Sequence, residues 1–167
     1  MPILEPLSFE CTSHSEEQTQ RLGMRLGALL QPGAVLALYG EIGAGKTSFA
    51  RGVGLGWGAD QILRSPTFTL VQKHHRAQDS AALYHVDLYR ATNEEDLRTL
   101  GLEEIIEDPL GVVVIEWPER VQHLLPEHTI HVRLRTVDEY RRHLTFATQN
   151  TQAWQTLLAF RKATFGV

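Results

Sequence analysis

Two short and almost entirely apolar runs stand out in the hydrophobic pattern of the chain. Residues 34–39 (Ala-Val-Leu-Ala-Leu-Tyr) lead into Gly40, and residues 111–117 carry four consecutive apolar residues before Glu116 and Trp117. Short apolar runs without alternating polar positions are typical of strands that are buried on both faces of a sheet. The pattern therefore predicts two buried strands.

Further segments have the composition or the alternation of more exposed strands. Residues 66–75 and 82–89 are rich in β-forming side chains and are separated by a polar connection, which predicts an antiparallel pair. Residues 130–137 and 144–147 alternate between apolar and polar positions. This alternation predicts half-exposed antiparallel strands near the end of the chain.

Helical periodicity appears first after Ser13, which with Glu16 has the form of a capping box. The apolar positions that follow recur at helical spacing and end before Pro32, namely Leu22, Leu26, Leu29 and Leu30. A second helix is predicted from the glycine-rich turn after Gly40 to about Val53. There, closely spaced glycines are expected to break it, namely Gly52, Gly54, Gly56 and Gly58.

Two more helices complete the prediction. Residues 92–95 form a second capping box, which opens a helix that Gly101 should interrupt, and residues 152–162 form a final helix. Strands that alternate with helices indicate the α/β class. We expect a single α/β domain over residues 1–167, with a central, mostly parallel sheet, antiparallel additions, and helices on both faces.

Composition narrows the class of protein. The chain has 167 residues, of which 43% are hydrophobic and 22% charged, as in ordinary globular proteins. A net charge of −4 is too mild for general attraction to nucleic-acid phosphates, and the single cysteine, Cys11, cannot form an internal disulfide. We expect a cytoplasmic protein, since the chain has neither a secretion signal at its start nor an apolar run long enough to cross a membrane.

A phosphate-binding motif occupies residues 40–47, where Gly-Glu-Ile-Gly-Ala-Gly-Lys-Thr fits the pattern G-x-x-x-x-G-K-[ST] between a predicted strand and a predicted helix. Glycines let successive backbone N–H groups turn toward one polyphosphate, and the helix offers its positive end. Lys46 is suited to contact the β- and γ-phosphates and Thr47 to ligate Mg²⁺. The motif therefore predicts binding of a nucleoside triphosphate, and we expect residues 1–167 to form a single P-loop NTPase domain.

Two acids are candidates for the metal site, because both are associated with hydrophobic, strand-like runs. Glu116 follows a buried run, and Asp87 lies within a second β-like segment. A surface acid at a strand end is the alternative for each. Residues 65–69 are either a switch that senses the γ-phosphate or an ordinary turn and strand.

Neither the histidines nor the arginines near the end of the chain form a pattern that indicates a chemical role. His74, His75 and His85 lack a third close ligand with metal-binding spacing, so we expect surface positions. Four arginines near the end of the chain are explained equally well as exposed strand positions, namely Arg133, Arg135, Arg141 and Arg142.

Five sequence blocks in the same order and at similar spacing resemble the bacterial TsaE family, formerly YjeE. The blocks are residues 40–47, 65–71 and 85–90, Gly101, and residues 115–118. The resemblance extends from Ser13 to Pro126. It implies a small ATPase that is needed, with TsaB, TsaD and TsaC, to make N6-threonylcarbamoyladenosine at position 37 of tRNAs reading codons that begin with A.

The same resemblance implies roles for particular residues, with ATP and Mg²⁺ as ligands. The implied catalytic residues are Lys46, Asp87 and Glu116, and the implied Mg²⁺ ligands are Thr47, Asp87 and Glu116. The implied nucleotide-binding residues are Glu16, Ile42, Gly43, Ala44, Gly45, Lys46, Thr47, Ser48, Thr67 and Trp117. We expect Glu16 to approach the adenine.

The resemblance also implies partners, which are homologues of TsaD and TsaB in a protein complex, with only indirect contact to tRNA and none to membranes. No arginine finger is identifiable from the sequence. We therefore expect weak hydrolysis by the chain alone, stimulation by the TsaB–TsaD complex, and a role for hydrolysis in resetting that complex.

Three other functions remain open on the residues alone. A P-loop kinase of small molecules has a similar size. A GTP-dependent switch would need the guanine-reading motif N-K-x-D, whereas the nearest string, residues 93–96, lacks the lysine. A module that binds ATP without hydrolysis is the third.

Overall fold

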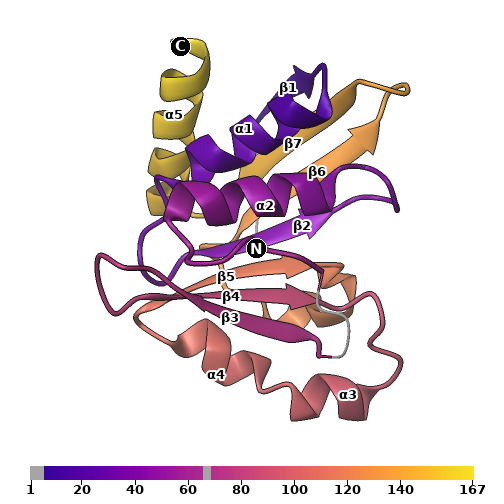
Figure 1. Cartoon of the computed structure of the whole chain (residues 1–167), viewed down its shortest axis with the longest axis vertical. Coiled ribbons are helices and arrows are strands. Elements are labelled where there is room, and N and C mark those ends of the chain that lie inside the picture. Colours follow the sequence, from indigo (N-terminus) through magenta and orange to yellow (C-terminus); the bar gives the residue numbers. More distant parts are fainter. Residues whose placement is uncertain (1–5, 66–68) are drawn as a thin grey trace, which may run out of the picture.

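The computed structural model describes residues 6–65 and 69–167 of the chain. Within these residues, seven strands and six helical segments follow one another, and Figure 1 shows how they are arranged. In order they are β1 (Leu7–Ser13), α1 (Glu16–Gly27), β2 (Val35–Tyr39), α2 (Lys46–Trp57), β3 (Val71–His75), β4 (Ala82–Asp87), α3 (Glu94–Thr99), α4 (Leu102–Glu107), β5 (Gly111–Glu116), the 3₁₀ segment η1 (Pro118–Leu124), β6 (Ile130–Thr136), β7 (Arg142–Thr148) and α5 (Thr151–Phe165).

All seven strands belong to one sheet with the order β1-β7-β6-β2-β5-β4-β3. The four central strands, β6, β2, β5 and β4, are parallel to one another. The antiparallel additions are β3 at one edge and β7 and β1 at the other. The predicted fold class is therefore confirmed, including the parallel centre and the antiparallel additions.

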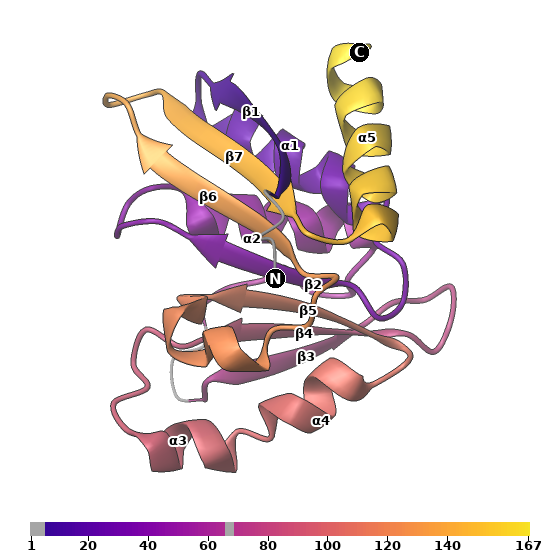
Figure 2. The same ribbon diagram turned by 180° about the vertical axis from the view of Figure 1, so that it is seen from behind.

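Helices cover both faces of the sheet (Figures 1 and 2). On one face α1, α2 and α5 pack over a core that includes Leu36, Phe49 and Phe146, all fully buried. On the other face α3, α4 and η1 contribute to a second core around Ile115 and Leu102. The strands β2 and β5 are buried along their whole length because both cores contact them, which explains their apolar sequences.

Two predicted helix starts are wrong by one or two residues. The N-cap of α1 is Ser15, not Ser13, and its side chain accepts a hydrogen bond from the backbone N–H of Gln18. The N-cap of α3 is Asn93, not Thr92. In each case the N-cap is a polar residue closer to the first helical residue than the predicted one. The sequence therefore predicted that a helix begins here, but placed its first residue slightly too early.

The second helix continues beyond the predicted break at Val53 and ends at Trp57, before Gly58. The expectation of a break is therefore wrong. The reason is close packing of α2 against α1. A Cβ atom built on Gly52 would lie 2.0 Å from the carbonyl oxygen of Gln20, and one built on Gly56 would lie 1.9 Å from that of Met24. These two glycines allow the backbone of α2 to lie in direct contact with the backbone of α1.

Two further differences concern strands, and a third observation concerns membrane spans. β1 was not predicted, although it forms an edge of the sheet and pairs with β7. The predicted strand over residues 66–75 is present from Val71 onward, while residues 66–68 lie outside the described part of the chain. None of the helices within residues 6–65 and 69–167 is long and apolar enough to cross a membrane.

Candidate nucleotide site

The P-loop connects β2, the central strand of the sheet, to the start of α2. Gly43 and Gly45 have φ angles of 83° and 102°, a left-handed region that glycine occupies without a steric penalty. The first N–H groups of α2 have no partner within the helix, and the helix dipole adds partial positive charge there. Residues 40–47 thus have the geometry of an anion-binding loop.

Lys46 is the first residue of α2 and folds back over this loop. Its Nζ donates hydrogen bonds to the carbonyl oxygens of Gly40 and Glu41 and lies 4.1 Å from the centre of the Trp117 ring. Burial lowers the pKa of the ammonium group, and the nearby carboxylate of Glu116 partly offsets this effect. The side chain therefore places a partly desolvated positive charge next to the loop.

A hydroxyl and two carboxylates gather beside Lys46. Glu116, at the end of β5, is 2% exposed, and its Oε1 lies 3.5 Å from Oγ1 of Thr47. Asp87, at the end of β4, is the register partner of Glu116, so both side chains stand at one edge of the sheet. Burial raises the pKa of Asp87, and the charge of Glu116 raises it further. Glu116 ends β5 as predicted, whereas Asp87, which was expected within a β-like segment, is the last residue of β4.

Trp117 follows Glu116 in an unusual backbone conformation. Its φ angle of 60° is the only positive φ of a residue other than glycine in the described part of the chain. Such a conformation is strained for a bulky side chain and persists only where surrounding contacts hold it. Here the indole packs against Tyr89, with ring centres 5.1 Å apart, and under the ammonium group of Lys46.

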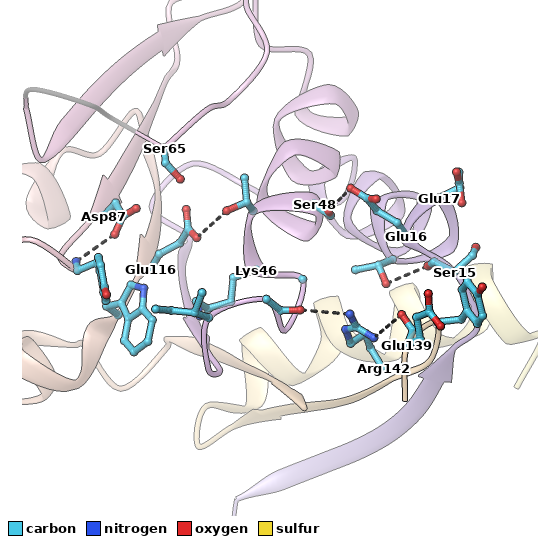
Figure 3. A pocket seen from close by; sticks show the side chains of 18 of the residues that line it. Ser15, Glu16, Glu17, Lys46, Ser48, Ser65, Asp87, Glu116, Glu139 and Arg142 are labelled. Carbon is cyan, nitrogen blue, oxygen red and sulfur yellow. Dashed lines mark hydrogen bonds between the residues drawn. The ribbon is translucent and has the colours of Figure 1, made fainter. Parts of the chain in front are cut away.

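These residues line an open cleft of about 950 Å³ that runs along the P-loop (Figure 3). The acids Asp87 and Glu116 stand at one end, together with Ser65. At the other end are Glu16 and Arg142. The Oε1 atom of Glu16 accepts a hydrogen bond from Oγ of Ser48 at 3.0 Å, which joins the start of α1 to the start of α2.

The cleft thus brings together most of the residues expected to bind nucleotide. Those that line it are Glu16, Ile42, Gly43, Gly45, Lys46, Thr47, Ser48, Asp87, Glu116 and Trp117. Ala44 lies within the same loop but is buried. Thr67 lies outside the described residues. The roles of these residues remain predictions, because their position alone does not test a role.

Sequence analysis missed two arginines of the cleft and the burial of two histidines. Arg90 and Arg142 both line the cleft, and Nη2 of Arg142 lies 3.2 Å from the carbonyl oxygen of Gly43. The expected surface position is wrong for His74 and His85, which are 5% and 0% exposed. His85 is part of the block at residues 85–90, but nothing in that block reveals its burial.

The sheet order and the loop define a P-loop protein of the α/β class. The crystal structure of YdiB from Bacillus subtilis has the same fold, with a TM-score of 0.74 over 96% of this chain and 99% of that chain at 24% identity. This chain belongs to the TsaE family. The family model described as threonylcarbamoyl adenosine biosynthesis protein TsaE matches residues 13–144.

Two relatives illustrate the similarity, and both are named tRNA threonylcarbamoyladenosine biosynthesis protein TsaE. The protein from Treponema pallidum is 42% identical over 139 residues, which is 83% of this chain and 100% of the relative. The protein from Bacillus subtilis is 34% identical over 130 residues, which is 78% of this chain and 79% of the relative. The match therefore covers the P-loop and both acids.

Proposed function

We propose that this protein is a Mg²⁺-dependent ATPase that supports formation of N6-threonylcarbamoyladenosine at position 37 of tRNA in the cytoplasm. In this proposal it acts on a TsaB–TsaD complex, which ATP hydrolysis resets. The main support is the approach of the Glu116 carboxylate to the Thr47 hydroxyl, 3.5 Å apart beside the P-loop. Membership of the TsaE family connects this site to the tRNA modification.

The donor atoms fit the expected metal. Mg²⁺ prefers hydroxyl and carboxylate oxygens and keeps several waters. Thr47 and Glu116 supply such oxygens close together, and Asp87 stands beside them. We assign the metal to Thr47 and Glu116, with Asp87 acting on the metal or its waters. When bound, the ion neutralises charge on the β- and γ-phosphate oxygens.

The residues of the chain account for the remaining parts of the reaction. The N–H groups of the loop and the start of α2 hold the phosphates, and Lys46 adds positive charge to them. Asp87, at the end of β4 beside Glu116, orients the attacking water. Positioning and electrostatics then supply most of the rate enhancement.

The direction of the nucleotide follows from the two ends of the cleft. The acids mark the end where the γ-phosphate reacts, so the base extends toward Glu16 and Arg142. Apolar side chains at the rim of the cleft are well exposed, with Ile42 at 72% and Tyr140 at 68%. Exposed apolar side chains beside an open site favour its completion by a partner, which adds support to the expectation of slow hydrolysis by the chain alone.

A cellular experiment tests the proposed function. The protein is depleted, and threonylcarbamoyladenosine in tRNA is quantified by mass spectrometry after rescue with wild type, Lys46→Ala or Lys162→Ala. Lys162 is exposed on α5 and does not line the cleft, so its variant is the control. We expect rescue by wild type and Lys162→Ala only. Unchanged modification after depletion would contradict the role in tRNA.

A second assay tests the proposed partner with purified proteins. ATP hydrolysis is measured for the chain alone and after addition of TsaB and TsaD. We expect a low rate for the chain alone and at least about a tenfold increase with the complex, which corresponds to about 1.4 kcal/mol in the barrier. A fast rate that the complex does not change would contradict partner stimulation.

At the end of the cleft opposite the acids, we expect Arg142 to contribute to ATP binding. Arg142→Ala removes the contact to the carbonyl oxygen of Gly43 and a positive charge near the phosphate loop. We expect about fivefold weaker ATP binding by isothermal titration calorimetry, since the side chain is partly exposed and its charge is screened. The control is Arg141→Ala, because Arg141 is exposed and pairs with Asp138 instead. Equal affinities of the two variants would exclude this role.

A further inference from the structure

Glu116 has a buried partner that the proposed chemistry does not use. Nε2 of His85, on the neighbouring strand β4, lies 2.6 Å from Oε2 of Glu116. The other carboxylate oxygen, Oε1, faces Oγ1 of Thr47 at 3.5 Å. His85 is 0% exposed and Glu116 is 2% exposed. The two oxygens of Glu116 are therefore directed to different groups, one to the interior and one to the cleft.

The surroundings of the two ring nitrogens of His85 indicate which of them carries the proton. Nδ1 of His85 is buried and has no hydrogen-bond partner among the described residues, whereas Nε2 faces a carboxylate, which only accepts. The arrangement therefore favours the tautomer with the proton on Nε2, which donates to Glu116. This donor occupies Oε2 and leaves Oε1 free to point into the cleft.

A fixed donor matters because a glutamate side chain has several rotatable bonds. Without a partner, the carboxylate of Glu116 could turn between the cleft and the interior, and ordering it would oppose metal binding. Residues that hydrogen-bond to a metal ligand without contacting the metal commonly hold that ligand in the orientation that the metal requires. His85 sits on β4, which lies between β5 and β3 and contributes Leu83 to one core and Val86 to the other, so its own position is well fixed.

His74 shows that burial alone does not produce this arrangement. It lies on the next strand, β3, is 5% exposed, and its Nε2 has no hydrogen-bond partner among the described residues. The chain thus contains two buried histidines on adjacent strands, of which His85 forms the hydrogen bond to the proposed metal ligand. His74 is therefore a natural control.

We infer that His85 is a positioning residue that holds Glu116 in the orientation needed to bind the divalent cation of the nucleotide site. The inference rests on the proposed function, because it assumes that Glu116 is a ligand of that cation. It assigns to His85 an effect on metal affinity through Glu116, without contact to the nucleotide.

The test measures Mn²⁺ binding by electron paramagnetic resonance in the presence of ADP, which separates metal affinity from turnover. The variants are His85→Leu, His85→Asn and His85→Gln, with His74→Leu as the control. The amide nitrogen of glutamine can reach the place of Nε2, whereas that of asparagine falls short of it. We expect about tenfold weaker Mn²⁺ binding for leucine and asparagine. Glutamine and His74→Leu should stay within about threefold of wild type.

A kinetic measurement adds a readout that a purely structural role would not change. For His85→Asn, we expect the loss of ATPase rate at low Mg²⁺ to be largely recovered at saturating Mg²⁺. Nucleotide affinity without metal should stay unchanged. Thermal unfolding of each variant identifies any loss of folding, and the asparagine and glutamine pair decides the question even if His85→Leu is unstable.

Two outcomes would overturn the inference while leaving the proposed function intact. One is wild-type Mn²⁺ affinity in His85→Asn, and the other is equal weakening by asparagine and glutamine. If wild type itself binds no Mn²⁺ with ADP, the proposed metal site fails, and the inference fails with it. These results are distinguishable because the first two require a wild-type protein that binds the metal.

Discussion

Replacement of Glu116 by glutamine is expected to lower the ATPase rate constant by about 10² to 10³. The substitution keeps the shape of a side chain that is 2% exposed but removes its negative charge next to Thr47. A loss of this size is typical when one preorganised electrostatic contact is removed from an active site. Rates are measured with saturating ATP and Mg²⁺, in the presence of TsaB and TsaD.

The control for this variant is Glu119→Gln, because Glu119 is an exposed acid close in sequence that does not line the cleft. It should hydrolyse ATP at nearly the wild-type rate. Binding of ADP without metal should stay within about twofold for both variants, because the phosphate loop is unchanged. Retention of most of the activity in Glu116→Gln would exclude the assigned role.

The same variant also separates an ATPase from a module that only binds ATP. If Glu116→Gln restores threonylcarbamoyladenosine in depleted cells although it has lost turnover, binding alone suffices and the proposed role of hydrolysis is wrong. We expect no restoration, because hydrolysis is proposed to reset the partner complex.

Gly56→Ala is expected to destabilise the protein by about 2–3 kcal/mol, although the same change usually stabilises a helix by about 1 kcal/mol. The added Cβ would lie 1.9 Å from the carbonyl oxygen of Met24 on α1, and a backbone atom cannot rotate away as a side-chain end can. The helices must therefore separate or the sheet contacts must shift. The expected fall in melting temperature is about 5–10 °C.

The melting temperatures of Gly56→Ala and of a control variant, Leu55→Ala, are measured by calorimetry. Leu55 is a suitable control because it precedes Gly56 in α2 and is 41% exposed. The control should lose no more than about 1 kcal/mol. Displacement of α1 should also weaken nucleotide binding, because α1 carries Glu16, whose carboxylate contacts Ser48. A melting temperature of Gly56→Ala equal to or above that of wild type would show that the two helices tolerate separation.

Local sequence patterns were sufficient for the centre of the fold. The apolar runs of β2 and β5, the P-loop between β2 and α2, and the acid at the end of β5 are all encoded within a few consecutive residues. Each depends on burial or on backbone conformation at one place in the chain. These features were therefore predictable without knowledge of the partner strands.

Features that depend on distant parts of the chain were harder to predict. The alternation of Leu7, Phe9 and Cys11 is a strand signal for β1, but its pairing partner β7 begins at Arg142. The four-residue spacing of Gly52 and Gly56 indicates close helix packing only once α1 is known to lie opposite. Propensity alone therefore favoured a helix break at a place where tertiary packing requires glycine.

The same limit applies to the site. His85 and Glu116 are 31 residues apart, and Arg142 and Gly43 are 99 residues apart, so no local motif joins them. The sheet order brings β4 next to β5 and places the start of β7 near the P-loop. Position within the sheet, and not residue type, decides which histidine is buried against an acid.

The central position of β2 has a mechanical consequence for the proposed binding of nucleotide. One side of β2 carries β6, β7 and β1, with Arg142 reaching the loop, and the other side carries β5, β4 and β3, with both acids. A ligand held by both groups links the two halves of the sheet across their midline. By mass action, nucleotide binding then raises the free energy of unfolding by RT ln(1 + [L]/Kd), so resistance to heat and proteases would rise with the nucleotide supply.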